Sequence, residues 1–146
     1  MSFRVGGSLQ VVLEEGAVMF RNTKAFSGFA VRDLEQAKAF YGGTLGIDVT
    51  DEDGPLLTLH LAGGRDTLIY PKPDLVPGNY TMLNFAVDDI DAAVDALTER
   101  GVSIERYDGF DQDERGISRS PVGPRIAWFT DPSGNILAVL QDAESS

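Results

Sequence analysis

The sequence predicts an α+β fold in which two βαβββ modules form a curved, mixed sheet around a cavity. The first observation is a repeat, because FAVRDL at residues 29–34 matches FAVDDI at residues 85–90, 56 positions later. The second is that each copy passes directly from an apolar strand pattern into a helical pattern. The third is that three further strand patterns follow each helix in the same order, which indicates an internal duplication.

The first module begins with a strand that ends near Val31, and Asp33 is expected to cap the helix that follows. Gln36 stands three residues after this cap and completes a pattern similar to a capping box. Three strands are expected next, at about 47–51, 55–62 and 66–71, with Gly54-Pro55 and Gly63-Gly64 as turns. The apolar stripe of the helix comprises Leu34, Ala37, Phe40, Tyr41 and Leu45.

The second module repeats this order. Asp89 is expected to cap its helix, and Gly101 is expected to end it as a C′ glycine. Strands are expected at about 102–107, 124–130 and 135–141, the last two joined by a hairpin turn, Asp131-Pro132-Ser133-Gly134. The apolar stripe of this helix comprises Ile90, Ala93, Val94 and Leu97.

The length of 146 residues suits one domain, which we place at residues 21–146 with modules at about 24–71 and 80–141. The Pro-rich linker between the modules, residues 71–79, is too short to separate independent domains. Residues 1–20 differ from the rest. They are interpreted either as a short strand or as an N-terminal appendage, an arm that a dimer would use.

Composition excludes several classes of function. The chain has 12 Lys and Arg against 23 Asp and Glu, a net charge of −11, which disfavours binding to nucleic acid. It has no Cys and one His, His60, so disulfides, thiolate catalysis and a His-rich zinc site are excluded. No stretch reaches the roughly 20 apolar residues of a membrane helix. Glu14 and Glu15 stand where a signal peptide would be apolar, so a cytoplasmic protein is expected.

Strand alternation assigns a face to each residue of the repeated strands. Phe29 and Val31, with their counterparts Phe85 and Val87, are expected to pack beneath the helices. The opposite faces are expected to line the cavity, and a concave surface with a few polar groups is typical of ligand pockets. These cavity residues are Phe26, Gly28 and Ala30 in the first module and Met82, Asn84 and Ala86 in the second.

At residues 24–141 the chain resembles the vicinal oxygen chelate superfamily, which includes glyoxalase I, bleomycin resistance proteins, fosfomycin resistance enzymes and extradiol dioxygenases. The resembling motifs are Val31-Arg32-Asp33-Leu34 with Phe40-Tyr41 and Leu45-Gly46, residues 85–89, and residues 131–135. The resemblance implies the glyoxalase/bleomycin-resistance-like fold. It also implies modules paired within a chain or across a dimer, and we expect a homodimer because one module leaves an open sheet edge.

The resemblance also allows the family's metal positions to be checked. Members that use a metal place His, Glu or Gln at four positions, and here these match Phe26, Thr67, Met82 and Ala138. Phenyl, methyl and thioether groups are poor ligands for hard or borderline divalent metals. We therefore expect no metal site and no cofactor.

Further candidates follow from side-chain chemistry. Tyr70 and Trp128 are suited to stack on a flat ligand, or to ordinary packing. Asn84 is suited to fix a ligand through its amide, or to bond neighbouring backbone. His60 is interpreted as a satisfied strand histidine, a ligand contact or a general base. The irregular stretch 107–123 is either a solvated loop or a lid that folds Phe110 over the cavity.

The candidate ligand-binding residues are Phe26, Gly28, His60, Thr67, Tyr70, Met82, Asn84, Phe110, Trp128 and Ala138. The function they favour is metal-independent binding of a small molecule, cationic or aromatic in character, and no catalytic residue is assigned. The alternative is a glyoxalase-like lyase, isomerase or dioxygenase with an atypical site, so whether the protein is an enzyme stays open. A third interpretation is a partner-binding domain without a small ligand.

Overall fold

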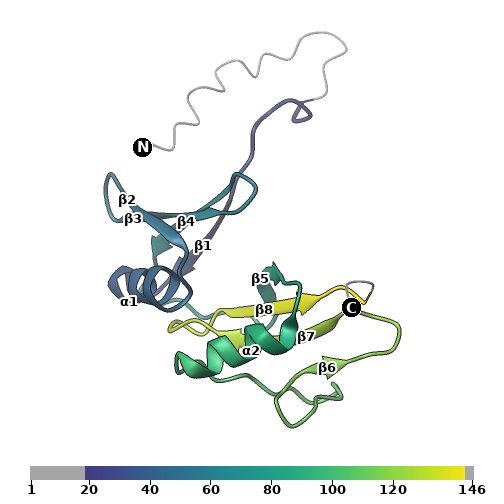
Figure 1. The fold of residues 1–146 in the computed structure, drawn as a ribbon. Helices are drawn as coiled ribbons and strands as arrows, with labels where there is room; N and C mark the ends of the chain where they lie inside the picture. Colours follow the sequence, from purple (N-terminus) through teal and green to yellow (C-terminus); the bar gives the residue numbers. More distant parts are fainter. Residues whose placement is uncertain (1–18, 144–146) are drawn as a thin grey trace.

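The computed structural model describes residues 19–143, which form two four-stranded sheets, one for each module (Figure 1). The α+β class and the paired βαβββ modules are confirmed. The predicted appendage falls outside the described residues except for Met19 and Phe20, which lie in a turn. The strands are β1 (Ser27–Val31), β2 (Asp48–Glu52), β3 (Leu56–Leu61), β4 (Arg65–Pro71), β5 (Thr81–Ala86), β6 (Ser118–Arg119), β7 (Arg125–Thr130) and β8 (Ile136–Gln141).

Both sheets are mixed and follow the same topology. Their strand orders are β1-β4-β3-β2 and β5-β8-β7-β6. In each sheet the first strand of the module pairs in parallel with its last full-length strand, and the other pairs are antiparallel. The first and last strands of each module therefore lie side by side, with the first strand at one edge of its sheet.

The two helices begin where their capping residues predict. The Asp33 side chain accepts a hydrogen bond from the backbone N–H of Gln36 at 3.1 Å, and α1 (Leu34–Lys38) follows. The helix then continues as a π-helix, η2 (Ala39–Thr44), in which Tyr41 is fully buried. Asp89 caps α2 (Ile90–Glu99) in the same way, through the N–H of Ala92.

One predicted strand is absent from the structure. Residues 102–107 form only an isolated bridge, in which the Glu105 N–H donates to the Trp128 carbonyl at 2.7 Å. Beyond this bridge the chain leaves the sheet as a loop and returns as β6, which pairs with β7 in the place that β2 takes beside β3 in the first sheet. The prediction of a strand at 102–107 is wrong because the apolar residues Val102 and Ile104 pack against the core without a continuous ladder.

A single hydrophobic core joins the modules on the side that carries the helices. It combines Leu59 and Ile69 of the first sheet with Phe129 and Leu137 of the second. None of the helices in the described part of the chain is long and apolar enough to cross a membrane. Helix α2 lies along β7 and β8 (Figure 1).

The turn between β7 and β8 fastens one module to the other through buried polar contacts. We call this set the inter-module clasp, comprising Tyr41, Asp131, Ser133 and Asn135. The Tyr41 hydroxyl donates to Asp131 Oδ2 at 2.7 Å, and the Asn135 amide donates to the carbonyl of Ala30 at 2.8 Å. The Ser133 hydroxyl accepts from the N–H of Arg32 at 2.8 Å.

The clasp also changes the acid–base chemistry of its phenol. Burial, followed by the neighbouring Asp131 carboxylate and its hydrogen bond, raises the pKa of Tyr41 well above its ordinary value. The neutral phenol is therefore the form that the folded protein keeps.

Candidate functional site

The open face of the second sheet, meaning the face turned away from α2, carries a row of three site candidates. Asn84 on β5 pairs with Ala138 on β8, and Ala138 pairs with Trp128 on β7, so the three side chains share this face. Asn84 is exposed, whereas Ala138 is fully buried. The small Ala138 side chain thus separates an amide from an indole across the face of the sheet.

Two aromatic side chains from the loop after α2 gather on Trp128. The Phe110 ring lies 4.7 Å from the Trp128 ring between centroids, and the Tyr107 ring lies 5.6 Å away in an edge-on arrangement. The Trp128 indole N–H donates to the Thr81 hydroxyl at 3.1 Å. We call Tyr107, Phe110 and Trp128 the aromatic cluster. Its spacing falls within the range of favourable ring pairs.

The two outer members of the aromatic cluster differ in accessibility from the indole. Trp128 is only 7% exposed, whereas Phe110 is 53% exposed. Partial burial, together with Glu105, raises the pKa of Tyr107. The cluster therefore presents one ring to solvent above a covered indole.

Gln112 shapes the loop that brings these rings together, and sequence reasoning did not identify it. Its amide donates to the carbonyls of Glu105 and Gly116, at 2.9 and 2.7 Å, and its oxygen accepts from the Tyr107 N–H at 2.9 Å. A polar residue in an irregular stretch has no periodic signal, so these contacts become visible only in the fold.

The open face of the first sheet carries the other site candidates. Gly28 on β1 pairs with Leu68 on β4, and Tyr70 pairs with Ala30 two residues further along. Phe26, which immediately precedes β1, is 47% exposed, and Tyr70 is 42% exposed. Both aromatic residues therefore have accessible ring surface.

A hydrogen-bonded chain of polar side chains crosses this face. Asp66 Oδ1 accepts from His60 Nδ1 at 3.1 Å, and His60 Nε2 is hydrogen-bonded to the Thr50 hydroxyl at 2.9 Å. Thr50 in turn donates to Glu52 Oε2 at 3.1 Å, and Thr58 donates to the same oxygen at 2.7 Å. The Thr58 hydrogen bond, with help from Thr50, holds the pKa of Glu52 below its ordinary value. His60 thus has a carboxylate neighbour, which sequence reasoning did not expect.

Thr67 does not share the open face with these residues. It pairs with Ser27, and the two hydroxyls are hydrogen-bonded at 2.9 Å on the helix-facing side, where Thr67 is 3% exposed. Its neighbours Asp66 and Leu68 take the open-face positions on β4. From the sequence, Thr67 is expected on the cavity face. The alternation of β4 is shifted by one residue from that expectation, and a shift of one residue moves a side chain to the other face of the strand.

Met82 lies in an irregularity of β5. The register with β8 shifts between Thr81 and Leu83, which leaves Met82 as the extra residue of a bulge. Among residues 19–143, no group of three or more His, Cys, Asp or Glu side chains is placed to hold a metal ion.

A separate pocket of about 400 Å³ lies where the modules meet, and none of the predicted site residues lines it. Its walls come from η2, from the segment after α2 and from the turn after β7. The lining residues are Phe40, Thr44, Arg100, Gly101, Val102, Ser103, Glu105, Thr130, Asp131 and Pro132.

The chain is similar to several solved structures. TnmS3, an antibiotic binding protein from Streptomyces sp. CB03234, is 29% identical, with a TM-score of 0.61 over 83% of this chain and 98% of that one. A glyoxalase/bleomycin resistance protein from the same organism is 30% identical, with a TM-score of 0.55 over 80% of this chain and 100% of that one. The fosfomycin resistance protein FosX from Listeria monocytogenes shares the fold at 15% identity, with a TM-score of 0.65 over 84% of this chain and 95% of that one.

No curated protein matches the chain. A family model does match, and it covers residues 25–139, which include every helix and strand of the two modules except the last two residues of β8. The repeated modules, their shared topology and this match agree. The chain belongs to the Glyoxalase/Bleomycin resistance protein/Dioxygenase superfamily.

Proposed function

We propose that the protein binds a planar aromatic small molecule on the open face of its second sheet, without a metal ion. The observation that carries this proposal is the aromatic cluster, where the half-exposed Phe110 ring lies on Trp128. A flat ligand that lies on the exposed surface of the Phe110 ring would gain a stacking contact there. The exposed Asn84 amide offers a donor and an acceptor in the same row of the sheet.

The charge of the chain favours one kind of aromatic ligand over another. A net charge of −11 attracts cations and repels anions at long range. The proposed ligand is therefore a cationic or neutral ring system. Similarity to an antibiotic binding protein at 29% identity supports this class of function, since that relative also takes a small molecule.

Metal independence and dimerisation are parts of the same proposal. At the four positions that resemble the family's metal sites, Phe26, Met82 and Ala138 provide no suitable ligand, and Thr67 lies on the helix-facing side. Strands β1 and β5 are edge strands in the described part of the chain, and a second copy would cover such edges. Light scattering that gives the mass of one chain would contradict the dimer.

Replacing Phe110 tests the binding site. The probe is proflavine, a planar cationic acridine, followed by its own fluorescence. We expect Phe110→Ala to weaken proflavine binding by about tenfold, because about 1.4 kcal/mol of stacking is lost. The matched control is Phe20→Ala, which removes another exposed phenylalanine that makes no contact with the aromatic cluster and should leave the affinity unchanged. Equal affinity of Phe110→Ala and wild type would exclude the aromatic cluster as the site.

The polar chain on the first sheet favours a second candidate function, that of a lyase, isomerase or dioxygenase with an atypical site. Asp66 accepts from His60 Nδ1 and orients the imidazole, so a substrate that displaced Thr50 from Nε2 would meet a nitrogen suited to act as a general base. This candidate function uses a different sheet from the aromatic cluster. Replacing His60 therefore separates the two functions.

For the binding function, we expect His60→Ala to leave proflavine affinity within about twofold of wild type, since the imidazole makes no contact with the aromatic cluster. Fluorescence titration of both proteins checks this. A substrate whose turnover is lost in His60→Ala, at unchanged proflavine affinity, would favour the enzyme instead.

A further inference from the structure

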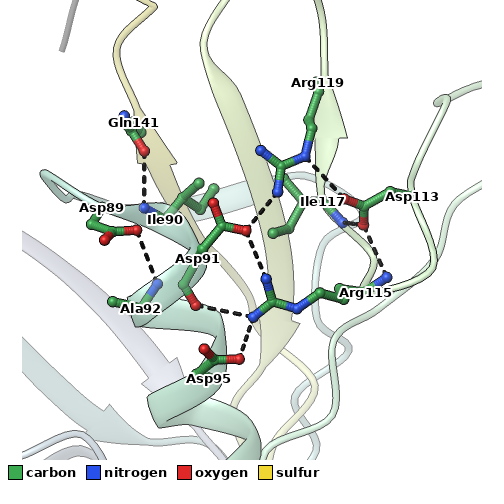
Figure 2. A network of polar contacts seen from close by, with 10 residues as sticks. All are labelled: Asp89, Ile90, Asp91, Ala92, Asp95, Asp113, Arg115, Ile117, Arg119 and Gln141. Carbon is green, nitrogen blue, oxygen red and sulfur yellow. Dashed lines mark hydrogen bonds and ion pairs between the residues drawn. The ribbon is translucent and has the colours of Figure 1, made fainter. Parts of the chain in front are cut away.

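The loop that carries Tyr107 and Phe110 is attached to α2 by a network of charged side chains (Figure 2). Arg115 reaches from the loop to the first turns of α2. Its Nη1 donates to Asp91 Oδ1 at 2.6 Å, and its Nη2 donates to the Asp91 carbonyl at 3.1 Å and to the Asp95 carboxylate. One guanidinium thus contacts two successive turns of the helix.

Asp113 is the centre of the same network. Its Oδ1 accepts from the N–H groups of Arg115 and Ile117, each at 2.9 Å, so the carboxylate orders the turn from which Arg115 projects. Its Oδ2 accepts from Arg119 Nε at 3.0 Å, and Arg119 also donates to Asp91 Oδ1 at 2.6 Å. Figure 2 shows both arginines converging on Asp91.

The arrangement is more than a set of surface ion pairs. An isolated exposed pair contributes only about 0–1 kcal/mol, but here two arginines share one carboxylate and Asp113 adds two backbone hydrogen bonds. Partial burial would raise the pKa of Asp113. The N–H groups of Ile117 and Arg115 and the Arg119 guanidinium outweigh it and hold this pKa below its ordinary value. The ionised carboxylate is therefore the form that the loop requires.

The network is close in sequence to the rings. Phe110 precedes Asp113 by three residues, and between them Gln112 is fixed to Glu105 and Gly116. On the other side, Ile117 is fully buried and secures the end of the loop in the core. The rings therefore occupy a short segment that is held before Tyr107 by the hydrogen bond of the Glu105 N–H to the Trp128 carbonyl, and after Phe110 by Gln112 and the contacts to α2.

We propose that Asp113 and Arg115 are positioning residues that hold Phe110 and Tyr107 over Trp128 by fastening the loop to α2. The effect of this attachment on ligand binding rests on the proposed function, because the positions of the rings matter to a ligand only if the aromatic cluster is the binding site. The shielding of Trp128 does not rest on it.

Trp128 is the only tryptophan of the chain, so its fluorescence reports on this loop directly. We expect Arg115→Gln to raise the acrylamide quenching constant of Trp128 about twofold, because local opening of the loop exposes the indole. NaCl should raise the wild-type constant by screening the ion pairs and should change the variant little. Arg115→Lys, which keeps a charge, should return part of the shielding.

The control is Lys38→Gln, which breaks the exposed Lys38–Asp51 pair of the first module and should leave quenching unchanged. Far-UV circular dichroism establishes that each variant is folded. If Arg115→Gln does not fold, Asp95→Asn, which removes only the outermost carboxylate, serves in its place. Unchanged quenching in a folded variant would overturn the proposal.

Proflavine titration of the same variants separates this proposal from the proposed function. Raised quenching together with weaker proflavine binding supports both. Raised quenching with unchanged proflavine binding supports the positioning of the rings over Trp128 and contradicts the aromatic cluster as the ligand site.

Discussion

Asp131→Ala is expected to lower the free energy of unfolding by about 3–5 kcal/mol, the largest single effect in the molecule. Asp131 is 4% exposed, and its two oxygens accept from the Tyr41 hydroxyl, the N–H groups of Ser133 and Asn135, and the Asn135 amide. Alanine leaves the Tyr41 hydroxyl and the two N–H groups inside the protein with no acceptor, and the Asn135 amide keeps only the carbonyl of Ala30. The loss of the inter-module clasp would also loosen one sheet against the other.

Urea denaturation checks this expectation, with two substitutions for comparison. Tyr41→Phe removes a single donor and should cost about 1–2 kcal/mol. Asp51→Ala removes an aspartate from an exposed ion pair with Lys38 and should cost no more than about 0.5 kcal/mol. A value for Asp131→Ala as small as that for Asp51→Ala would mean that the clasp does not contribute to stability.

Gly116→Ala should destabilise the protein by about 2–4 kcal/mol, the second largest expected effect. Gly116 has φ of +89°, a conformation that costs other residues energy. In addition, a Cβ atom there would lie 2.5 Å from Ile104 Cγ2, so the side chain of Ile104 or the loop backbone must move.

Gly109 is a matched control in the same loop. Its φ is +91°, but a Cβ atom at this position would meet no atom within 4 Å. Gly109→Ala should therefore cost only the backbone strain, about 1–2 kcal/mol. Thermal and urea unfolding of both variants isolate the steric contribution as their difference. Equal losses in the two variants would show that Ile104 accommodates the methyl group.

The regular elements could be predicted because their signals are local. Asp33 and Asp89 each cap a helix through a backbone N–H three residues later, so a short window of sequence contains the whole interaction. The same holds for the turn that begins at Asp131. Its contact with Tyr41 could not be predicted, because 90 residues separate the partners and no local pattern relates them.

The faces of the candidate site residues could be predicted in part for the same reason. The alternation of β7 and β8 is regular, so it places Trp128 and Ala138 on one face. Met82 and Thr67 were harder, because a bulge or a one-residue change in strand phase exchanges the faces. Asp113 and Gln112 lie in a loop without periodicity, and their roles arise from backbone groups that any sequence possesses.

The parallel pairing of first and last strands has a consequence for the covalent chain. Since β1 pairs with β4 and β5 pairs with β8, each half completes its own ladder without a strand from the other half. The peptide between Pro71 and Thr81 contributes no strand to either sheet. It serves as a tether that keeps the halves at high effective concentration. A chain divided there would consist of two fragments that only the shared core and the inter-module clasp could bring together, an arrangement suited to a split-reporter format.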